Sequence, residues 1–527
     1  MEKRDNTIIN KIEIDVGAGK KPIDPNIYSN FIEHIGYCIN NGIWTYDDLI
    51  TDPLCKDNPY FIGIRESLLN AAKEMKISVL RAFGGCYSDV YHWKDAIGPR
   101  ESRKKVKNLQ WNRFPYKFLL HAGPDIENQF GTDEFCHFCE AINAEMYLNV
   151  NYSTGTPKEA AQWVDYCNGS ENTEYGALRA KNGREKPYNV KYWGIANEIW
   201  GPQEVGREKI PENYAKRYML FAKTMKAVDP SIKLVAVGWA RSAWNRGVLK
   251  EIDPEYIDYL SIHRYVPMAL IQLASPKKKR KSTKSRYYSL MAAYNRIESD
   301  INHAWDDIIS VYGKDTHVRI AFDEWGVWYQ AMRNATRDNL NLQDGIGTAD
   351  ILLSFQKMTE KCSMANWAQL VNFLGAIRTD KSGICLTGAY HALKMVRNHS
   401  QDYFIEDISV NCDTFDSKKY GFIKKSVNTP ILRCNATINE DGKNISLIVI
   451  NKHFNEPREV NINLKGFTPQ KQGVKFELNS ASPFDYNTED NRNRITIEEN
   501  KLDDVQSTMD VVLPAHSVTI FKLKRNK

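Results

Sequence analysis

The sequence of 527 residues lacks the long apolar runs and the charge excess that mark several classes of protein. No stretch reaches the roughly 18 consecutive apolar residues of a membrane span, so no membrane partner is expected. The net charge is only +6, which does not favour nucleic acid as a partner. Residues 1–6 contain no apolar region of the signal-peptide kind, so we expect a cytoplasmic protein. A secreted form whose signal peptide had been removed would look the same.

The sequence also lacks cysteines at the spacing of a metal site, and it lacks a glycine-rich loop of the kind that binds phosphate. The ten cysteines include one C-x-x-C pair, Cys136 and Cys139, but it falls in a predicted helix at 132–141 with no second pair nearby. Buried free thiols are therefore expected, as in a reducing compartment, and neither a metal nor an organic cofactor is predicted. No glycine-rich loop follows the first predicted strand, which counts against a doubly wound dinucleotide-binding sheet.

Short apolar runs alternate with amphipathic helices over residues 18–398. Helices are predicted at 158–167, 213–227 and 287–312, where apolar residues recur every three or four positions. Eight strands are expected, at 27–34, 77–83, 145–151, 191–198, 232–238, 257–263, 317–324 and 365–372. Eight β/α units over this length predict a closed (β/α)8 TIM barrel with long loops, in the α/β class.

After about residue 400 the helical periodicity gives way to period-two alternation. Strands are expected at 430–438, 445–451, 458–464, 494–497 and 517–523, with a hairpin turn at Asp441-Gly442. A strand at 8–16, ending at Gly17, has no place in the barrel. We therefore predict two domains: a catalytic barrel at 18–398, and an antiparallel, jelly-roll-like β-sandwich of residues 1–17 plus 399–527.

Polar residues gather at the ends of the predicted barrel strands, where barrel enzymes place their chemistry. Glu198 ends one strand and Glu324 another, and a glycosidase needs two such carboxylates flanking the sugar bond. A single strand-end glutamate is more often an ordinary surface charge. The other strand ends, however, carry Glu33, His34, Arg81, Asn149, Asn151, Asn197, His263, Tyr265, Asp323, Gln369 and Asn372. This recurrence favours a catalytic pocket.

Six motifs, in order and at strand ends, resemble the α-L-arabinofuranosidases of glycoside hydrolase family 51 over nearly the whole chain. They are IYSNFIEH at 27–34, LRAFGGC at 80–86 with YHWKD and IGP close behind, FGTDEF at 130–135, YWGIANE at 192–198, DEWGVWY at 323–329 and ANWAQLVN at 365–372. The resemblance implies an exo-acting, retaining hydrolase that removes terminal α-L-arabinofuranosyl residues from arabinan, arabinoxylan or arabino-oligosaccharides. It also implies a homo-oligomer, in the form of a trimer-based hexamer.

The same resemblance implies roles for individual residues. Glu198 would be the acid/base and Glu324 the nucleophile, with Asn197 on the sugar 2-hydroxyl and Tyr265 holding Glu324. The furanose pocket would be lined by Glu33, Arg81, Cys86, His263 and Gln369, with Trp328 and Trp93 as candidate walls. The residues themselves leave two of these roles open, since Arg81 also fits a barrel-interior ion pair and Trp93 a core position.

Some positions depart from the family pattern. Ala196 stands where a glycine usually precedes Asn-Glu, and Cys86 stands where a sugar-binding asparagine is often found. These departures bear on the identity of the sugar and leave the reaction class unchanged.

Two alternatives remain open. One is another retaining barrel glycosidase: an endo-glucanase, or a furanosidase for galactofuranose or D-arabinofuranose. The other is a non-catalytic protein that binds sugars, or that binds a polyanion through the basic run at 277–286. That run is read more simply as a solvated loop.

Overall fold

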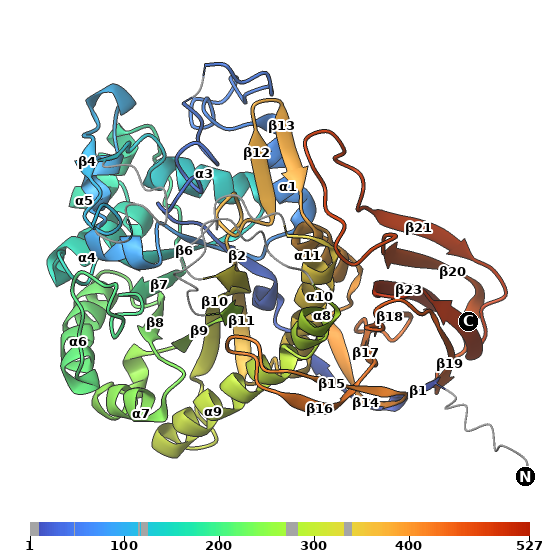
Figure 1. Cartoon of the computed structure of the whole chain (residues 1–527). Helices are drawn as coiled ribbons and strands as arrows, with labels where there is room; N and C mark the ends of the chain where they lie inside the picture. The colour runs from blue at the N-terminus through green and yellow to red at the C-terminus, as the bar shows by residue number, and fades with distance from the viewer. Residues whose placement is uncertain are drawn as a thin grey trace, which may run out of the picture.

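The computed structural model describes residues 10–46, 48–113, 116, 125–269, 283–330 and 340–526. The barrel strands are β2 Ser29–Phe31, β3 Val79–Ala82, β6 Glu145–Val150, β7 Tyr192–Ile195, β8 Lys233–Val237, β9 Tyr259–Ala269, β10 Arg319–Gln330 and β11 Cys362–Ala368. They close in the order β10-β11-β2-β3-β6-β7-β8-β9, every neighbour parallel. Helices surround this barrel (Figure 1), and the predicted TIM barrel is confirmed.

Two barrel strands run well past their predicted ends at 263 and 324. β9 and β10 stay paired with each other as far as Ala269 and Gln330, with a register shift just before Glu324. The extended pair therefore carries both the strand-end residues and the aromatic residues that follow them.

The outer layer contains the predicted helices at 132–141, 158–167 and 213–227. The helices are α1 Glu66–Met75, α3 Thr132–Ile142, α4 Pro157–Asn168, α5 Glu174–Lys181, α6 Pro211–Val228, α7 Ser242–Glu251, α8 Lys284–Met291, α9 Tyr294–Tyr312, α10 Leu342–Lys357 and α11 Gly388–His399. Both α4 and α6 begin with a proline in the first turn, where its missing N–H leaves no bond unmade. Among helices in the described ranges, none is long and apolar enough to cross a membrane.

The single helix predicted at 287–312 is wrong, because the chain divides at Ala292 into α8 and α9. The division lets α8 turn toward β15 (Thr414–Ser417) and the loop at 452–457. There the Tyr288 ring lies 4.7 Å from the ring of Phe415, between centroids, and its hydroxyl accepts the N–H of Phe454. Of the basic run, Lys284 and Arg286 lie in α8, while residues 277–282 fall outside the described residues.

The C-terminal part is a nine-stranded sheet in the order β21-β20-β23-β18-β17-β14-β1-β19-β22. Its strands are β1 Asn10–Pro22, β14 Tyr403–Asn411, β17 Leu432–Ile438, β18 Asn444–Asn451, β19 Arg458–Lys465, β20 Pro469–Leu478, β21 Ile497–Leu502, β22 Thr508–Leu513 and β23 Ser517–Arg525. Neighbours are antiparallel except β1 and β19, which pair in parallel. The predicted β-sandwich appended to the barrel is confirmed, and Gly442 in its hairpin turn has φ 71°.

The remaining strands form small two-stranded sheets. They are β4 Val106–Lys107 with β5 Asp125–Ile126, β12 Ile377–Asp380 with β13 Gly383–Leu386, and β15 Thr414–Ser417 with β16 Ser426–Pro430. Between elements lie short 3-10 turns such as η2 Cys86–Val90.

Two strand ends in the sandwich differ from prediction. β1 does not end at Gly17. It bulges between Asp15 and Lys20 and then pairs with β14 as far as Pro22, so the glycines there mark irregular pairing within one strand. The strand predicted at 494–497 lies instead at Ile497–Leu502, because the Ile495 backbone is bound by the side chain of Asn487.

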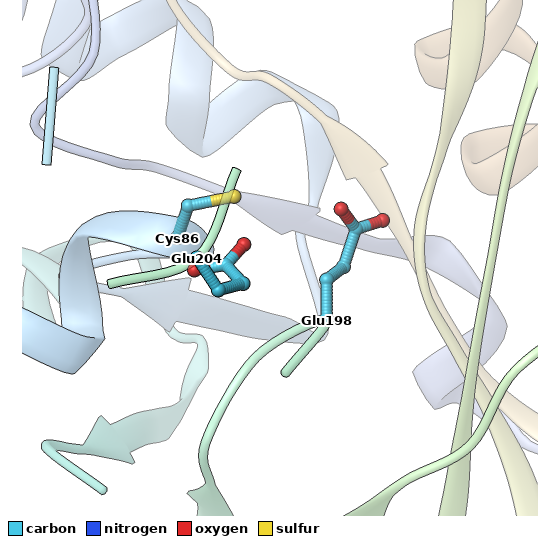
Figure 2. A group of neighbouring side chains, drawn as sticks. All are labelled: Cys86, Glu198 and Glu204. Carbon is cyan, nitrogen blue, oxygen red and sulfur yellow. The ribbon is translucent and has the colours of Figure 1, made fainter. Parts of the chain in front are cut away.

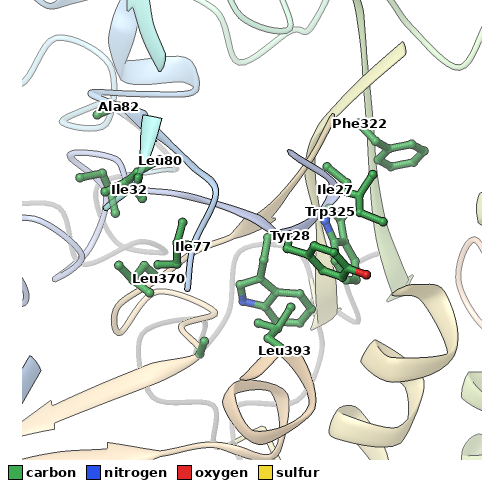
Figure 3. Packing of buried hydrophobic residues seen from close by; sticks show 14 of the residues in the cluster. Ile27, Tyr28, Ile32, Ile77, Leu80, Ala82, Phe322, Trp325, Leu370 and Leu393 are labelled. Atoms are coloured by element: carbon green, nitrogen blue, oxygen red, sulfur yellow. The ribbon is translucent and has the colours of Figure 1, made fainter. Parts of the chain in front are cut away.

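The core of the barrel has two distinct layers, one between the strands and the surrounding helices and one inside the ring of strands. Between strands and helices, apolar side chains from η1 (Pro25–Tyr28), β3, β10 and α11 pack together (Figure 3). Inside the barrel, six of the eight strands contribute a separate cluster of Val79, Tyr147, Tyr192, Val235, Ala321 and Met364. This cluster fills the barrel interior, so a ligand pocket is expected at the C-terminal ends of the strands. The ten cysteines are free, and seven of them are buried, as expected.

Candidate active site

Two carboxylates face each other, one from Glu198 just after β7 and one from Glu324 within β10. One carboxylate oxygen of Glu198 and one of Glu324 lie within 4.8 Å of each other, and a ring nitrogen of His263 lies within the same distance of both. His263 Nδ1 is 2.9 Å from Glu198 Oε1 and 3.6 Å from Glu324 Oε2. The fold thus brings the two predicted catalytic glutamates into one pocket, with an imidazole between them.

Glu324 is held from both sides. Its Oε1 accepts a hydrogen bond from Arg81 at 2.8 Å, and its Oε2 accepts one from the Tyr265 hydroxyl at 2.9 Å. Burial raises the pKa of Glu324, while the charges of His263 and Arg81 oppose that rise. With a donor on each oxygen, the carboxylate is fixed in one orientation.

Arg81 is both a barrel-interior ion pair and a pocket residue. Its side chain is 1% exposed and stacks on the ring of Phe31. Beyond Glu324, it donates from Nη2 to Asn197 Oδ1 at 2.7 Å and from Nε to Asn149 Oδ1 at 3.3 Å. One buried guanidinium therefore orients the residues that end three barrel strands.

His263 is bound on its other edge by Asp323. His263 Nε2 lies 3.2 Å from Asp323 Oδ1, and the Tyr147 hydroxyl donates to Asp323 Oδ2 at 2.8 Å. Burial disfavours the charged imidazole, but Glu324, Asp323 and Glu198 together raise the pKa of His263 to about 10. Burial likewise disfavours ionised Asp323, but Arg81 and His263 hold the pKa of that carboxyl below its usual range. The site thus contains an imidazolium among three carboxylates.

The remaining predicted residues complete the pocket. Glu33 accepts the Tyr87 N–H at 2.8 Å and the Gln369 amide at 3.3 Å. Burial and the charge of Glu324 raise the pKa of Glu33 to about 8. Cys86 Sγ accepts a hydrogen bond from Asn197 Nδ2 at 3.5 Å. The ring of Trp328 stands edge-on to that of Tyr265, with centroids 5.1 Å apart.

Several strand-end residues lie elsewhere. Trp93, in the 3-10 turn Trp93–Ala96, is 1% exposed and stacks on Trp163, so of the two roles left open for it the core position holds. His34 is buried against Phe83 and Tyr87. The side chains of Asn151 and Asn372 bind backbone and threonine groups, and so hold their loops in place.

Sequence reasoning missed two residues in the loop after β7. Gln203 donates from Nε2 to Glu198 Oε2 at 2.6 Å. Glu204 is buried beside Glu198 and Cys86 (Figure 2). Neither residue lies on a strand end or in a periodic pattern. Their closeness in sequence to Glu198 is the signal that could have found them.

Two protein-family models match the chain. The model described as the alpha-L-arabinofuranosidase 1 domain matches residues 71–282. The model described as the alpha-L-arabinofuranosidase C-terminal domain matches residues 323–517.

Individual relatives match along almost the full length. The chain is 33% identical over 524 residues to alpha-L-arabinofuranosidase C of Emericella nidulans, covering 95% of each protein. It is 31% identical over 524 residues to the intracellular exo-alpha-L-arabinofuranosidase of Bacteroides ovatus, covering 97% of this chain and 95% of that protein. The solved structure of the thermostable GH51 alpha-L-arabinofuranosidase from Thermotoga petrophila RKU-1 matches with a TM-score of 0.82 at 33% identity, covering 98% of this chain and 100% of that one.

Proposed function

Because this chain belongs to the α-L-arabinofuranosidases of glycoside hydrolase family 51, we propose that it releases terminal α-L-arabinofuranosyl residues from arabinan, arabinoxylan or arabino-oligosaccharides. The observation that carries this proposal is the spacing of Glu198 and Glu324, since one carboxylate oxygen of each lies within 4.8 Å of the other. Retaining glycosidases place their carboxyl groups about 5–5.5 Å apart, whereas inverting enzymes need roughly 6.5–9.5 Å to admit a water. The spacing supports a retaining double displacement.

In the first step Glu324 attacks the anomeric carbon while Glu198 protonates the leaving oxygen. The bond from the sugar to its leaving group breaks as the ester to Glu324 forms. In the second step Glu198 takes a proton from a water molecule, which attacks the same carbon and frees Glu324. Arg81 and Tyr265 hold the nucleophile in line throughout, because each donates to a different oxygen of Glu324.

His263 supplies the proton for the first step through its contact with Glu198. A charged His263 carries a proton on Nδ1, which lies 2.9 Å from Glu198 Oε1. The negative charge of Glu324 is one reason that the pKa of His263 is raised. As Glu324 becomes an ester it loses this charge, so the proton passes more readily to Glu198 and the leaving oxygen.

The other pocket residues bind the furanose. Asn197, fixed by Arg81, presents its amide to the 2-hydroxyl, and Glu33, Gln369 and Cys86 contact the remaining hydroxyls. With its raised pKa, Glu33 is protonated at neutral pH and can donate as well as accept. Trp328 forms an apolar wall beside Tyr265.

A panel of nitrophenyl glycosides, with product stereochemistry followed by NMR, tests this function. We expect hydrolysis of the α-L-arabinofuranoside and initial release of the α-anomer. Faster hydrolysis of a galactofuranoside, a D-arabinofuranoside or a cello-oligosaccharide would favour another glycosidase. No turnover of any of them would favour a non-catalytic sugar-binding protein.

We also propose that the protein is a cytoplasmic homo-oligomer, assembled as a hexamer. The hexamer rests on the resemblance to family 51, and the location is supported by the intracellular relative from Bacteroides ovatus. Light scattering after size-exclusion chromatography tests the assembly, and cell fractionation tests the location. A monomer, or recovery in the culture medium, would contradict these proposals.

A further inference from the structure

A thiol and two carboxylates converge beside the proposed acid/base in an arrangement that glycoside hydrolysis does not require. Cys86 begins η2, Glu198 follows β7, and Glu204 lies further along the same loop as Glu198. One ligand atom from each lies within 4.8 Å of the other two. Figure 2 shows the Cys86 sulfur close to the Glu204 carboxylate, with Glu198 reaching toward the same region.

Glu204 is the unusual member of this group. It is 3% exposed, and within the described ranges its carboxylate oxygens meet no nitrogen or oxygen donor, while the thiol of Cys86 faces them. Burying a carboxylate without a partner is costly unless it is neutralised or meets a cation. The Glu198 carboxylate lies within 4.8 Å, so one cation bound between the two side chains would meet both acidic groups.

The ligand set fits a borderline-soft divalent cation. Zn²⁺ binds thiolate at about 2.3 Å and carboxylate oxygen at about 2.0–2.2 Å, with tetrahedral geometry. At those lengths the ligand atoms lie roughly 3.3–3.7 Å apart, so the three groups need to approach by at most about 1.5 Å. Rotation of the two glutamate side chains would supply this movement, and a water molecule would take the fourth position. The thiolate disfavours Mg²⁺ and Ca²⁺, which prefer oxygen ligands alone.

We propose that Cys86, Glu198 and Glu204 form an inhibitory site for a thiophilic divalent cation of the Zn²⁺ class. On binding, the thiol releases its proton to solvent and the sulfur ligates the metal. The cation also takes an oxygen of Glu198 and competes with its bonds to His263 or Gln203. Glu198 can then no longer protonate the leaving oxygen. The inhibition rests on the proposed role of Glu198 in catalysis, whereas the metal binding does not.

Co²⁺ titration of the metal-free, full-length protein tests the site directly. A thiolate ligand gives a charge-transfer band in the near ultraviolet, and tetrahedral Co²⁺ gives visible bands that Zn²⁺ should abolish. We expect both sets of bands in the wild type and in the control Cys55→Ser, which removes another partly exposed thiol. Cys86→Ser should lose the charge-transfer band. Glu204→Gln should weaken binding at least about tenfold, since losing even an outer partner of a metal ligand costs this much.

Inhibition of nitrophenyl arabinofuranoside hydrolysis provides the second measurement. Each variant is compared with its own metal-free rate. Zn²⁺ should inhibit the wild type reversibly, chelator should restore activity, and arabinose should raise the Zn²⁺ concentration needed for half-inhibition. Glu204→Gln should need at least about tenfold more Zn²⁺.

The outcomes separate the two proposals. Bands that persist in Cys86→Ser, or equal affinity in wild type and Glu204→Gln, would overturn the metal site. Bands that depend on both residues in a chain without arabinofuranosidase activity would support the metal site and overturn the proposed function. Circular dichroism checks that each variant is folded, and the nearly isosteric Glu204→Gln keeps the test decisive if Cys86→Ser does not fold.

Discussion

At the scale of single residues, the two facing glutamates should respond differently to removal. Glu324→Ala should lose nearly all turnover on every substrate, because no other group replaces the nucleophile. Glu198→Ala should lose about 10²–10⁴-fold on arabino-oligosaccharides, whose leaving oxygen needs a proton. It should lose much less on the nitrophenyl glycoside, whose leaving group hardly needs one. Steady-state rates on both substrates measure this, with Glu251→Ala at the exposed end of α7 as the control. Wild-type rates in both active-site variants would refute the assignment.

Buried His34 should make the protein sensitive to acid. Burial lowers the pKa of His34 to about 3, and neither ring nitrogen has a hydrogen-bond partner in the described part of the chain. The unfolded pKa is about 6.5, so the stability that the neutral ring contributes is complete above that pH and is lost as pH falls toward 3. Between pH 7 and pH 4 this amounts to about 3 kcal/mol.

His34→Phe cannot titrate, so its free energy of unfolding should fall less than that of the wild type between the two pH values. Urea unfolding at pH 7 and pH 4 measures the difference, and His303→Phe on the exposed side of α9 is the control. Equal losses in His34→Phe and wild type would show that His34 is not the group responsible.

The sequence could predict a site residue only where a local pattern determines the place of that residue in the fold. The strand periodicity and the motifs identify Glu198, Glu324 and Arg81, because a barrel brings all of its strand ends to one face. The burial of Glu204 depends on how the loop after β7 folds. Contacts with residues far away in the chain determine that fold, such as the hydrogen bond from Gln110 to the Gln203 carbonyl. No local pattern in the sequence carries that information.

At the scale of elements, β7 shows how closely the backbone supports the site. A Cβ on Gly194 would lie 2.3 Å from Asn149 Oδ1 and 3.0 Å from the Tyr147 hydroxyl. These two side chains support Arg81 and Asp323. We therefore expect Gly194→Ala to lower kcat/KM by about tenfold or more while the barrel still folds, since small displacements of catalytic groups are costly. Unchanged kcat/KM in a folded variant would contradict this expectation.

The matched change at Ala196, the residue directly after β7, should be tolerated. Ala196 has φ 73°, in the left-handed region, which explains why the family pattern usually has glycine there. Ala196→Gly relieves backbone strain of about 1–2 kcal/mol. The extra entropy of glycine in the unfolded chain costs about 0.5–1 kcal/mol, which offsets about half of that gain. Activity should be kept, and the melting temperature should stay level or rise slightly. A clear drop in melting temperature would mean that the Ala196 side chain has a packing role.

Elements also show where periodicity fails as a guide. The apolar pattern at 287–312 continues unbroken through Ala292, yet the chain turns there. The contacts of Tyr288 in α8 with Phe415 and Phe454 decide the turn, and these partners lie more than a hundred residues away. The bulge in β1 is likewise decided by its pairing with β14.

At the scale of the whole molecule, buried charges join the barrel to the sheet. Lys452, which follows β18 and is 0% exposed, lies 2.7 Å from Asp350 Oδ2 in α10. Arg433 in β17 approaches the other oxygen of Asp350 at 3.2 Å. The ring of Tyr294 in α9 lies beside both cations. We propose that the predicted domains at 18–398 and at 1–17 plus 399–527 are coupled through this cluster and unfold together.

Asp350→Asn should be strongly destabilising, because it leaves two buried cations without their shared carboxylate. Breaking a buried pair by removing one partner typically costs about 3–5 kcal/mol. Lys452→Met should cost less, since Asp350 keeps Arg433 and the methionine chain fills the same space. Lys443→Met, which breaks an exposed pair with Asp441, is the control and should change little. Differential scanning calorimetry should show one transition that shifts furthest down in Asp350→Asn. Two separate transitions in the wild type, or an Asp350→Asn variant as stable as the control, would show that these charges do not couple the barrel to the sheet.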